Sequence, residues 1–500
     1  MNREWDVRVR RTMRRLFQLA GDEVPALFRK SSWPAKVIGR CAKDEEFKTA
    51  LLRFIDVLPS LPHGEAAAAY LMDYFGGREK PLPPGLKLNF TSLSPESLQR
   101  AQWISEEIRK MMRGFIAAST LEEAVPVLQG FRDQGMAFSV DLLGEAVLSE
   151  TEADAHAQQY LDLLDQLGDL QAGWPALGDS AGDLDWGVAA KINVSIKPSS
   201  LYSQMNARAF ERSISAAKER LRPILRKAMT LGAHLCLDME QVDLKSLTLS
   251  LYRSLMEEPE FKGYPHSGMV FQSYLRDSGK DLLDLVAWAR KRKHRPTIRL
   301  VKGAYWEAER VYAAQRNWPV PVYTDKHETD ENFEKLAHLL LENHEWVHLA
   351  CASHNFRSIA SVLEKAQEQG DRSEPVEYQV LYGMAEPVQK ALLKAGFPVR
   401  VYAPVGEMIP GMAYLARRLL EITSKESFLL QRFGEGIPGE KSPRKPLSVM
   451  RKEPLPQDKT EREDRDFKNE PLRDWSLGQN RSRFAAALRK TRERFPVAVP

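Results

Sequence analysis

The chain contains few cysteines: Cys41, Cys236 and Cys351 are the only three among 500 residues. An odd and sparse number of cysteines argues against a framework of disulfide bonds, which stabilises many small secreted domains. The cysteine content therefore fits a protein of a reducing compartment. The length is sufficient for several average domains, or for one large α/β barrel with additional segments.

Long apolar segments are also missing from the sequence. No run approaches the ~20 residues that a membrane-spanning helix needs, and the first 21 residues lack the apolar core of a signal peptide. These residues instead form a basic amphipathic pattern, with Trp5, Val9 and Leu16 among its apolar positions. We expect a first helix that packs on the protein, and contact with a membrane surface is the alternative.

The charges are nearly balanced, because the net charge is only +4. Such a balance gives no indication of nucleic-acid binding. Three common site signatures are missing as well: the dinucleotide fingerprint GxGxxG, the phosphate-binding GxxxxGK(S/T) and the hydrolase turn GxSxG. Cys351 and His354 lack a second pair of ligands at zinc spacing, so we expect no metal site.

The pattern of predicted elements changes near residue 130. The preceding residues indicate helices separated by proline and glycine, whereas short β-rich runs then alternate with long helical stretches. Eight such runs, each followed by room for a helix, predict a closed (βα)8 barrel, and a doubly wound open sheet is the main alternative. The predicted strands span 136–143, 192–198, 233–239, 268–275, 297–304, 346–353, 376–383 and 398–405.

Polar side chains recur near the carboxyl ends of these predicted strands. In a (βα)8 barrel the active site is assembled at that end from several strands. One polar residue at the end of a strand carries little information, but a set at the same rim predicts a polar pocket. The set comprises Asp141, Lys197, Asp238, Glu240, Gln272, Lys302, Tyr305, His354, Asn355, Tyr382 and Tyr402.

A predicted helix follows the last strand, within residues 401–421. Positions i, i+3, i+4 and i+7 share one helical face, and here they hold Tyr414, Arg417, Arg418 and Glu421. The apolar residues fall about half a turn away and comprise Met412, Leu415, Ala416 and Leu419. The polar face either lines the pocket or, as in an ordinary outer helix, points into solvent.

Cations are concentrated at this predicted rim. The neighbouring Arg417 and Arg418 offer two planar guanidinium groups, which suit a carboxylate or a phosphate. Lys197, Arg299 and Lys302 add three further positive charges. A cluster of cations without counter-charge is unfavourable, so the pattern implies an anionic ligand or paired acids. A salt-bridge network in which these residues only satisfy one another is the alternative.

The character of the chain shifts again from about residue 440. This part is rich in charge and proline and poor in apolar periodicity, which predicts a linker or a wrapping arm. A last helix is expected within residues 480–495. The sequence shows no internal repeat and no low-complexity block.

Several segments of the chain resemble the proline dehydrogenase region of the bifunctional proline utilization A flavoenzymes. The similarity runs in order through residues 136–425, and "RLVKGAYW" and "YLARRLLE" are its most specific parts. The segment "FKNEPLRDW" resembles the start of the aldehyde dehydrogenase half of those enzymes, so we expect a chain truncated before that domain. No N-terminal segment resembles the ribbon-helix-helix of gene-regulating members, so nucleic acid is not an expected partner.

The resemblance implies a distorted (βα)8 barrel that binds FAD at the carboxyl ends of its strands. It divides the chain into a helical N-terminal region (1–130), the barrel (131–430), and a linker with the start of the missing domain (431–500). The implied reaction oxidises L-proline to pyrroline-5-carboxylate, with hydride transfer to flavin N5 and electrons passed to a membrane quinone. The expected localisation is cytoplasmic, with peripheral contact at the inner membrane as an addition.

The resemblance also implies roles for individual residues. Arg417, Arg418 and Lys197 hold the proline carboxylate, and the remaining catalytic residues are Tyr402 and Tyr414 as walls of the ring, Tyr305 in the same site, and Asp238 as a support of Lys197 or Tyr402. The positions matching flavin contacts are Gln272, Arg299, Lys302, Gly303, Ala304, Trp306, Thr329, His354 and Asn355. Asp325 departs from the family pattern, which has a basic or neutral residue there.

Loss of hydride from the carbon beside nitrogen requires an unprotonated amine. Nearby cations disfavour the ammonium form, so the groups that hold the carboxylate are also expected to prepare the amine. Two further hypotheses remain open. One is a Schiff-base lyase with Lys197 or Lys302 as nucleophile; the other is a docking fragment that is active only within a longer protein.

Overall fold

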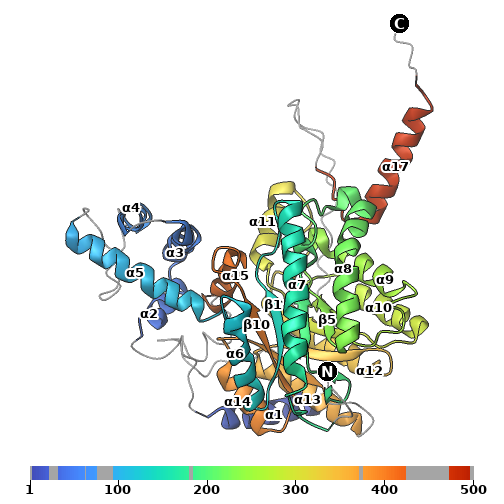
Figure 1. Cartoon of the computed structure of the whole chain (residues 1–500), viewed down its shortest axis with the longest axis horizontal. Helices are drawn as coiled ribbons and strands as arrows, with labels where there is room; N and C mark the ends of the chain where they lie inside the picture. The colour runs from blue at the N-terminus through green and yellow to red at the C-terminus, as the bar shows by residue number, and fades with distance from the viewer. Residues whose placement is uncertain are drawn as a thin grey trace.

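The computed structural model describes residues 3–21, 32–61, 64–75, 94–179, 184–370, 376–423 and 472–495. A barrel with surrounding helices forms its largest part, and a group of helices from the N-terminal third lies to one side of it (Figure 1). The helix nearest the C-terminus extends away from the barrel (Figure 1). The site described below lies in the barrel.

Eight parallel strands close into the barrel, and each pairs with the next one along the chain. The predicted (βα)8 barrel is therefore confirmed, and the doubly wound open sheet is excluded. The first strand, "AFSVDL", is buried at every position, as expected of a parallel strand covered by helices on its outer side. The strands are β1 (Ala137–Leu142), β4 (Asn193–Ile196), β5 (His234–Leu237), β6 (Ser267–Gln272), β7 (Thr297–Val301), β8 (His348–Ala352), β9 (Glu377–Leu381) and β10 (Val399–Val405).

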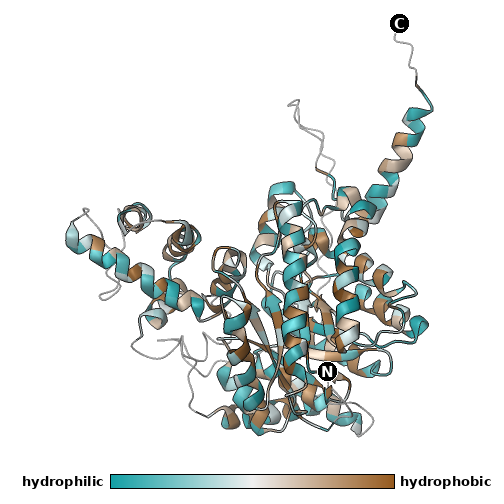
Figure 2. Ribbon diagram, viewed as in Figure 1, coloured by the Kyte–Doolittle hydropathy of each residue, from teal (hydrophilic) through white to brown (hydrophobic). Residues whose placement is uncertain are grey.

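The helices outside the barrel present apolar residues inward and polar residues outward (Figure 2). Two helices instead of one lie between β7 and β8, which is a departure from the simple alternation of the fold. The helices are α6 (Leu121–Asp133), α7 (Glu150–Gln171), α8 (Phe210–Leu231), α9 (Val242–Met256), α10 (Ser278–Arg292), α11 (Trp306–Arg316), α12 (Lys326–Glu342), α13 (Phe356–Glu368), α14 (Glu386–Lys394) and α15 (Met412–Thr423).

A short antiparallel hairpin, β2 (Leu184–Trp186) with β3 (Ala189–Ala190), precedes β4 and was not predicted. Its residues are too few to show an alternating pattern in the sequence. Asp185 in this hairpin forms a fully buried ion pair with Arg132 of α6, with 2.7 Å between Oδ1 and Nη2. The guanidinium of Arg132 also donates to the backbone oxygen of Pro175 and lies 5.0 Å from the centre of the Trp174 ring.

The first helix, α1 (Arg3–Ala20), packs against α13 and α14. This confirms the prediction of a first helix that packs on the protein. Trp5, Val9 and Leu16 are buried, so the apolar side of this helix is occupied by the protein itself. Ion pairs add to the packing: Arg357 of α13 lies 2.9 Å from Asp6. The alternative, in which these apolar side chains enter a membrane surface, does not match this arrangement.

Helices α2 (Trp33–Cys41), α3 (Glu45–Val57), α4 (Gly64–Phe75) and α5 (Pro95–Arg113) form a group beside the barrel, which we call the helical region. Ser32, Asp44 and Ser94 each cap the first turn of a helix by accepting a backbone N–H. The predicted boundary at residue 130 falls inside α6, and the boundary at 430 lies outside the described residues, so this division stays a prediction.

The predicted last helix is present as α17 (Gly478–Arg492), which has no buried residue. The segment before it contacts the barrel. The Trp318 indole, in the loop after α11, donates to the Leu472 backbone oxygen at 2.6 Å, and the Ser246 hydroxyl of α9 donates to the Ser476 backbone oxygen at 3.0 Å. The charged linker expected from residue 440 lies outside the described residues up to 471. Within the described ranges, no helix has the length and apolarity to cross a membrane. All three cysteines are buried and unpaired.

The buried pair of Arg132 and Asp185 generates a stability prediction. Arg132→Met leaves the Asp185 carboxylate buried without a counter-charge, so the free energy of unfolding should fall by about 3–5 kcal/mol. The matched control is Arg226→Met, which removes a pair with Glu260 whose side chains are half exposed. The control should lose less than about 1 kcal/mol in the same denaturant titration. Equal losses in the two variants would contradict the assigned burial.

Candidate active site

A pocket of about 250 Å³ opens at the carboxyl ends of the barrel strands. Strands and following loops from β4 to β10 contribute its walls, and α15 closes one side. Most of the predicted polar rim therefore forms one pocket, where barrel enzymes carry their active sites. Asp141, Glu240 and Tyr382 of the predicted set do not line it, and Tyr382 packs against Phe131 instead. All the proposed site residues line it except Trp306 and Thr329: Lys197, Asp238, Gln272, Arg299, Lys302, Gly303, Ala304, Tyr305, His354, Asn355, Tyr402, Tyr414, Arg417 and Arg418.

Trp306 and Thr329 do not line the pocket. The indole nitrogen of Trp306 donates to the backbone oxygen of Tyr323 at 2.8 Å, and Thr329 is buried in the first turn of α12. Asp325, which departs from the family pattern, caps α12 by accepting the His327 N–H at 2.9 Å. The next residue, Lys326, lines the pocket, so a basic group is present one position later than expected.

Lys197 follows β4 and lies in a buried polar cluster with Asp141, Asp238 and Tyr402. Its ammonium binds the Asp141 carboxylate, and Asp238 Oδ2 and the Tyr402 hydroxyl lie at 3.4 and 3.3 Å. Burial by itself lowers the pKa of Lys197, but the adjacent negative groups, Asp141 first, hold this pKa well above its ordinary value. Lys197 is therefore positively charged at neutral pH.

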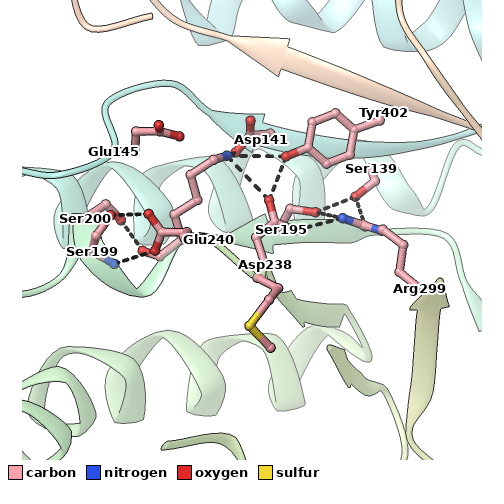
Figure 3. Close-up of polar contacts among 12 residues, drawn as sticks. Ser139, Asp141, Glu145, Ser195, Ser199, Ser200, Asp238, Glu240, Arg299 and Tyr402 are labelled. Atoms are coloured by element: carbon pink, nitrogen blue, oxygen red, sulfur yellow. Dashed lines mark hydrogen bonds and ion pairs between the residues drawn. The ribbon is translucent and has the colours of Figure 1, made fainter. Parts of the chain in front are cut away.

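Asp238 connects this cluster to the interior of the barrel. It accepts from the Tyr402 hydroxyl at 2.7 Å and from Arg299 Nη1 at 2.9 Å (Figure 3). Arg299 in turn donates to Ser195 at 2.8 Å and Ser139 at 3.1 Å, and lies against the Tyr402 ring. The expected support of Tyr402 and Lys197 by Asp238 is present, while the stronger partner of Lys197 is Asp141, which the sequence placed at the rim without a role.

The two arginines of α15 have similar surroundings. Arg417 forms a two-pronged ion pair with Glu145, with 2.8 Å between Nη2 and Oε2, and lies 4.6 Å from the centre of the Tyr305 ring. Arg418 donates to Glu421 at 2.6 Å and lies 5.1 Å from the centre of the Tyr414 ring. One carboxylate and one aromatic ring thus fix the position and orientation of each guanidinium group.

Glu145 was not among the predicted site residues. It lies in the loop after β1, and the sequence carries no signal that this acid, rather than a nearer one, reaches a helix 272 positions away. Lys302 likewise pairs with Asp330. The salt-bridge network weighed as an alternative is therefore present, and the rim carries paired charges rather than a strong positive field.

The network leaves several hydrogen-bond donors free for a ligand. Glu145 engages one N–H on each terminal nitrogen of Arg417, which leaves the Nε–H and two further hydrogens. In the part of the chain that the structure describes, Arg418 Nε and the Tyr414 hydroxyl are buried without a hydrogen-bond partner. Burial raises the pKa of Tyr414 to about 12, so its hydroxyl keeps its proton at neutral pH. These donors suit a carboxylate.

Two further groups have shifted pKa values. Burial, with a smaller contribution from Glu145, raises the pKa of the Glu240 carboxyl to about 7. Glu240 accepts from the Ser199 backbone N–H at 3.0 Å and from the Ser199 hydroxyl. Burial lowers the pKa of His354 to about 4, and its Nε2 accepts from the Leu381 N–H at 3.0 Å. His354 is therefore neutral, with its remaining proton on Nδ1.

The fold and the site together define a (βα)8 barrel with a buried polar pocket under its last helix. Residues 124–431 match the family model described as proline dehydrogenase, and residues 6–115 match the one described as the proline utilization A N-terminal domain. The chain belongs to the proline dehydrogenase family, which confirms the resemblance inferred from its segments.

The chain is similar both to bifunctional PutA proteins and to shorter proline dehydrogenases. The bifunctional protein PutA of Klebsiella aerogenes is 29% identical over 69% of this chain and 26% of the relative, and the proline dehydrogenase of Deinococcus radiodurans is 30% identical over 67% and 94%. The crystal structure of proline utilization A from Bdellovibrio bacteriovorus, inactivated by N-propargylglycine, is 37% identical with a TM-score of 0.82. It covers 99% of this chain, which in turn covers 49% of that chain.

Glu240 generates a prediction of pH dependence. Its folded-state pKa of about 7 exceeds the ordinary 4.5, so its contribution to stability is present at low pH and is lost as the pH rises from about 4.5 through 7. Glu240→Gln removes this pH-dependent loss of stability, because the glutamine side chain does not ionise. The variant should therefore gain stability relative to the wild type across this window, by about 3 kcal/mol at its upper end.

The measurement is the free energy of unfolding of both proteins at several pH values on either side of the window. Glu307→Gln, which removes a carboxylate from an exposed position on α11, is the control for loss of charge alone. A difference between wild type and Glu240→Gln that does not change with pH would show that Glu240 does not titrate there.

Proposed function

We propose that the protein is an FAD-dependent dehydrogenase that oxidises L-proline to pyrroline-5-carboxylate. The observation that carries this proposal is the pair of arginines on α15, both directed into the pocket of a proline dehydrogenase barrel with unused N–H groups. A small amino acid offers the carboxylate that these groups suit. The roles assigned to individual residues by resemblance remain part of this proposal.

The residues of the pocket fit a flavin. Gln272 Oε1 and Arg299 Nε are buried polar atoms without a partner among the described residues, and both side chains line the pocket. Gly303 has φ +132°, and a Cβ there would lie 2.6 Å from the Tyr274 ring, so only glycine suits this part of the wall. Gln272, Arg299, Lys302, Gly303, Ala304, His354 and Asn355 would hold FAD, which, when bound, accepts at N5 the hydride that leaves the carbon beside the proline nitrogen.

The chain's own residues would bind and orient the substrate. Arg417, Arg418 and the Lys197 ammonium would receive the carboxylate, and Tyr305, Tyr402 and Tyr414 would enclose the ring. The amine must be unprotonated for hydride to leave. Because the cations have acid partners, their field is weaker than the sequence led us to expect, and desolvation in the closed pocket is the larger factor that disfavours the ammonium form.

The Schiff-base lyase is less well supported by this geometry. An amine nucleophile must be neutral, whereas Lys197 is held in its charged form by Asp141 and Asp238. Lys302 is also engaged, by Asp330. Borohydride treatment in the presence of a carbonyl substrate should therefore trap no adduct on either lysine.

The wider context is proposed on the family relationship alone. The chain covers about half of the Bdellovibrio structure and about a quarter of the Klebsiella relative, which is named as a bifunctional protein. We infer that a covalently linked aldehyde dehydrogenase domain follows in a longer protein. We also infer a membrane quinone as the electron acceptor, and a cytoplasmic protein with peripheral contact at the inner membrane. The alternative is a docking fragment that has no proline dehydrogenase activity of its own and is active only within the longer protein.

Arg417→Met and Arg418→Met test the assignment of the carboxylate site. Each change removes charge-assisted hydrogen bonds worth about 1.5–3 kcal/mol, so kcat/KM for L-proline should fall by about 10- to 150-fold. FAD content, measured by absorbance of the purified protein, should remain close to that of the wild type. The control is Arg212→Met on the exposed face of α8. Parallel loss of FAD and of proline oxidation would contradict the separate roles.

A further inference from the structure

The helix that carries the two arginines does not belong to the hydrophobic core of the barrel. Leu415, Leu419 and Ile422 of α15 are fully buried, and all three lie in the core cluster that the helical region forms with a few residues of the barrel rim, such as Leu143 and Met384. Among the described residues, the cluster that fills the barrel and its surrounding helices contains no residue of α15. The apolar face of α15 is therefore covered by α2 and α3, which contact it directly.

Figure 1 shows α15 between the helical region and the barrel strands. Its two faces thus meet two different parts of the molecule. The apolar face joins the core cluster of the helical region, whereas Arg417 and Arg418 line the pocket of the barrel. Tyr414 belongs to that cluster and also lines the pocket. A displacement of the helical region would consequently move the guanidinium groups relative to the pocket.

A second contact links the helical region to the rim. Residues 114–118, which follow α5, run beside the end of β10, with Ala117 N–H donating to Pro404 O at 2.8 Å and Gly406 N–H donating to Ala118 O at 2.9 Å. The same segment lies against the turn after β9. Gly383 in that turn has φ +72°, and a Cβ on it would lie 1.8 Å from the backbone oxygen of Gly114.

We propose that the helical region is the positioning element of the substrate site: its core and residues 114–118 set the place of α15 and hence of Arg417 and Arg418. The effect on proline rests on the proposed function, whereas the mechanical link does not. Loosening the contact should weaken proline binding more than it changes the maximal rate, and should leave the flavin-contacting side of the pocket intact.

Two glycines of similar backbone conformation provide a matched test of residues 114–118. Gly383→Ala and Gly396→Ala both place a Cβ at positive φ, but the space around Gly396 is open to 4 Å, whereas Gly383 abuts Gly114. Amide hydrogen exchange in α15 should become faster in Gly383→Ala than in Gly396→Ala, while the barrel strands stay equally protected in both. This readout requires neither substrate nor turnover.

A second pair of variants tests the shared core. Leu415→Ala removes the same atoms as Leu285→Ala, which creates a cavity in the barrel core on α10. The KM for L-proline should rise on the order of tenfold or more in Leu415→Ala, with a smaller change in kcat, and should stay near the wild-type value in Leu285→Ala. Leu415→Met, which conserves volume, should restore the wild-type KM.

The outcomes separate this proposal from the proposed function. Unchanged exchange in α15 of Gly383→Ala and Leu415→Ala would overturn the positioning role, whatever the activity. Faster exchange in α15 of these variants, together with a flavin-loaded wild-type protein that proline cannot reduce, would support the mechanical link and refute the proline dehydrogenase assignment. An equal rise in KM in Leu415→Ala and Leu285→Ala would show that the rise results from a general loss of stability. This result would also overturn the positioning role.

Discussion

Two adjacent guanidinium groups on one helix must face the same pocket, and the rest of the site depends on how this is achieved. Arg417 and Arg418 repel each other, and burial adds a desolvation cost to both. The structure offsets these costs with a carboxylate and a tyrosine ring for each arginine. Those of Arg417, Glu145 and Tyr305, come from distant parts of the chain, whereas those of Arg418, Glu421 and Tyr414, lie on α15 itself. The result is a pair of fixed donors in the pocket wall, with N–H groups that these partners leave unused.

The same balance of charge extends through the barrel. Lys197 is paired with Asp141, and Arg299 with Asp238, so the pocket is polar and rigid without a large net charge. Such a rigid arrangement favours a ligand that binds to the unused donors and leaves the existing ion pairs intact. In the proposed reaction, the amine of the substrate would therefore be deprotonated mainly through desolvation, which depends on how completely α15 closes the pocket.

The sequence was sufficient for the barrel and for most of the rim, because parallel strands alternate with helices and their carboxyl ends meet at one edge. It was sufficient for the two faces of α15, which follow from helical periodicity. It could not identify Glu145, since contacts between distant loops leave no local pattern, nor the hairpin at Asp185, which is too short to show one. Trp306 and Thr329 were assigned to the flavin by resemblance alone, and they do not line the pocket, because Trp306 hydrogen-bonds to Tyr323 and Thr329 is buried in α12.

The central claim is that this pocket brings a proline carboxylate and a flavin together. The most direct measurement is the absorbance spectrum of the FAD-loaded protein under anaerobic conditions, before and after addition of L-proline. The account predicts that proline bleaches the flavin bands of the wild-type protein within a single turnover. A spectrum that shows bound flavin and does not change at saturating proline would contradict it.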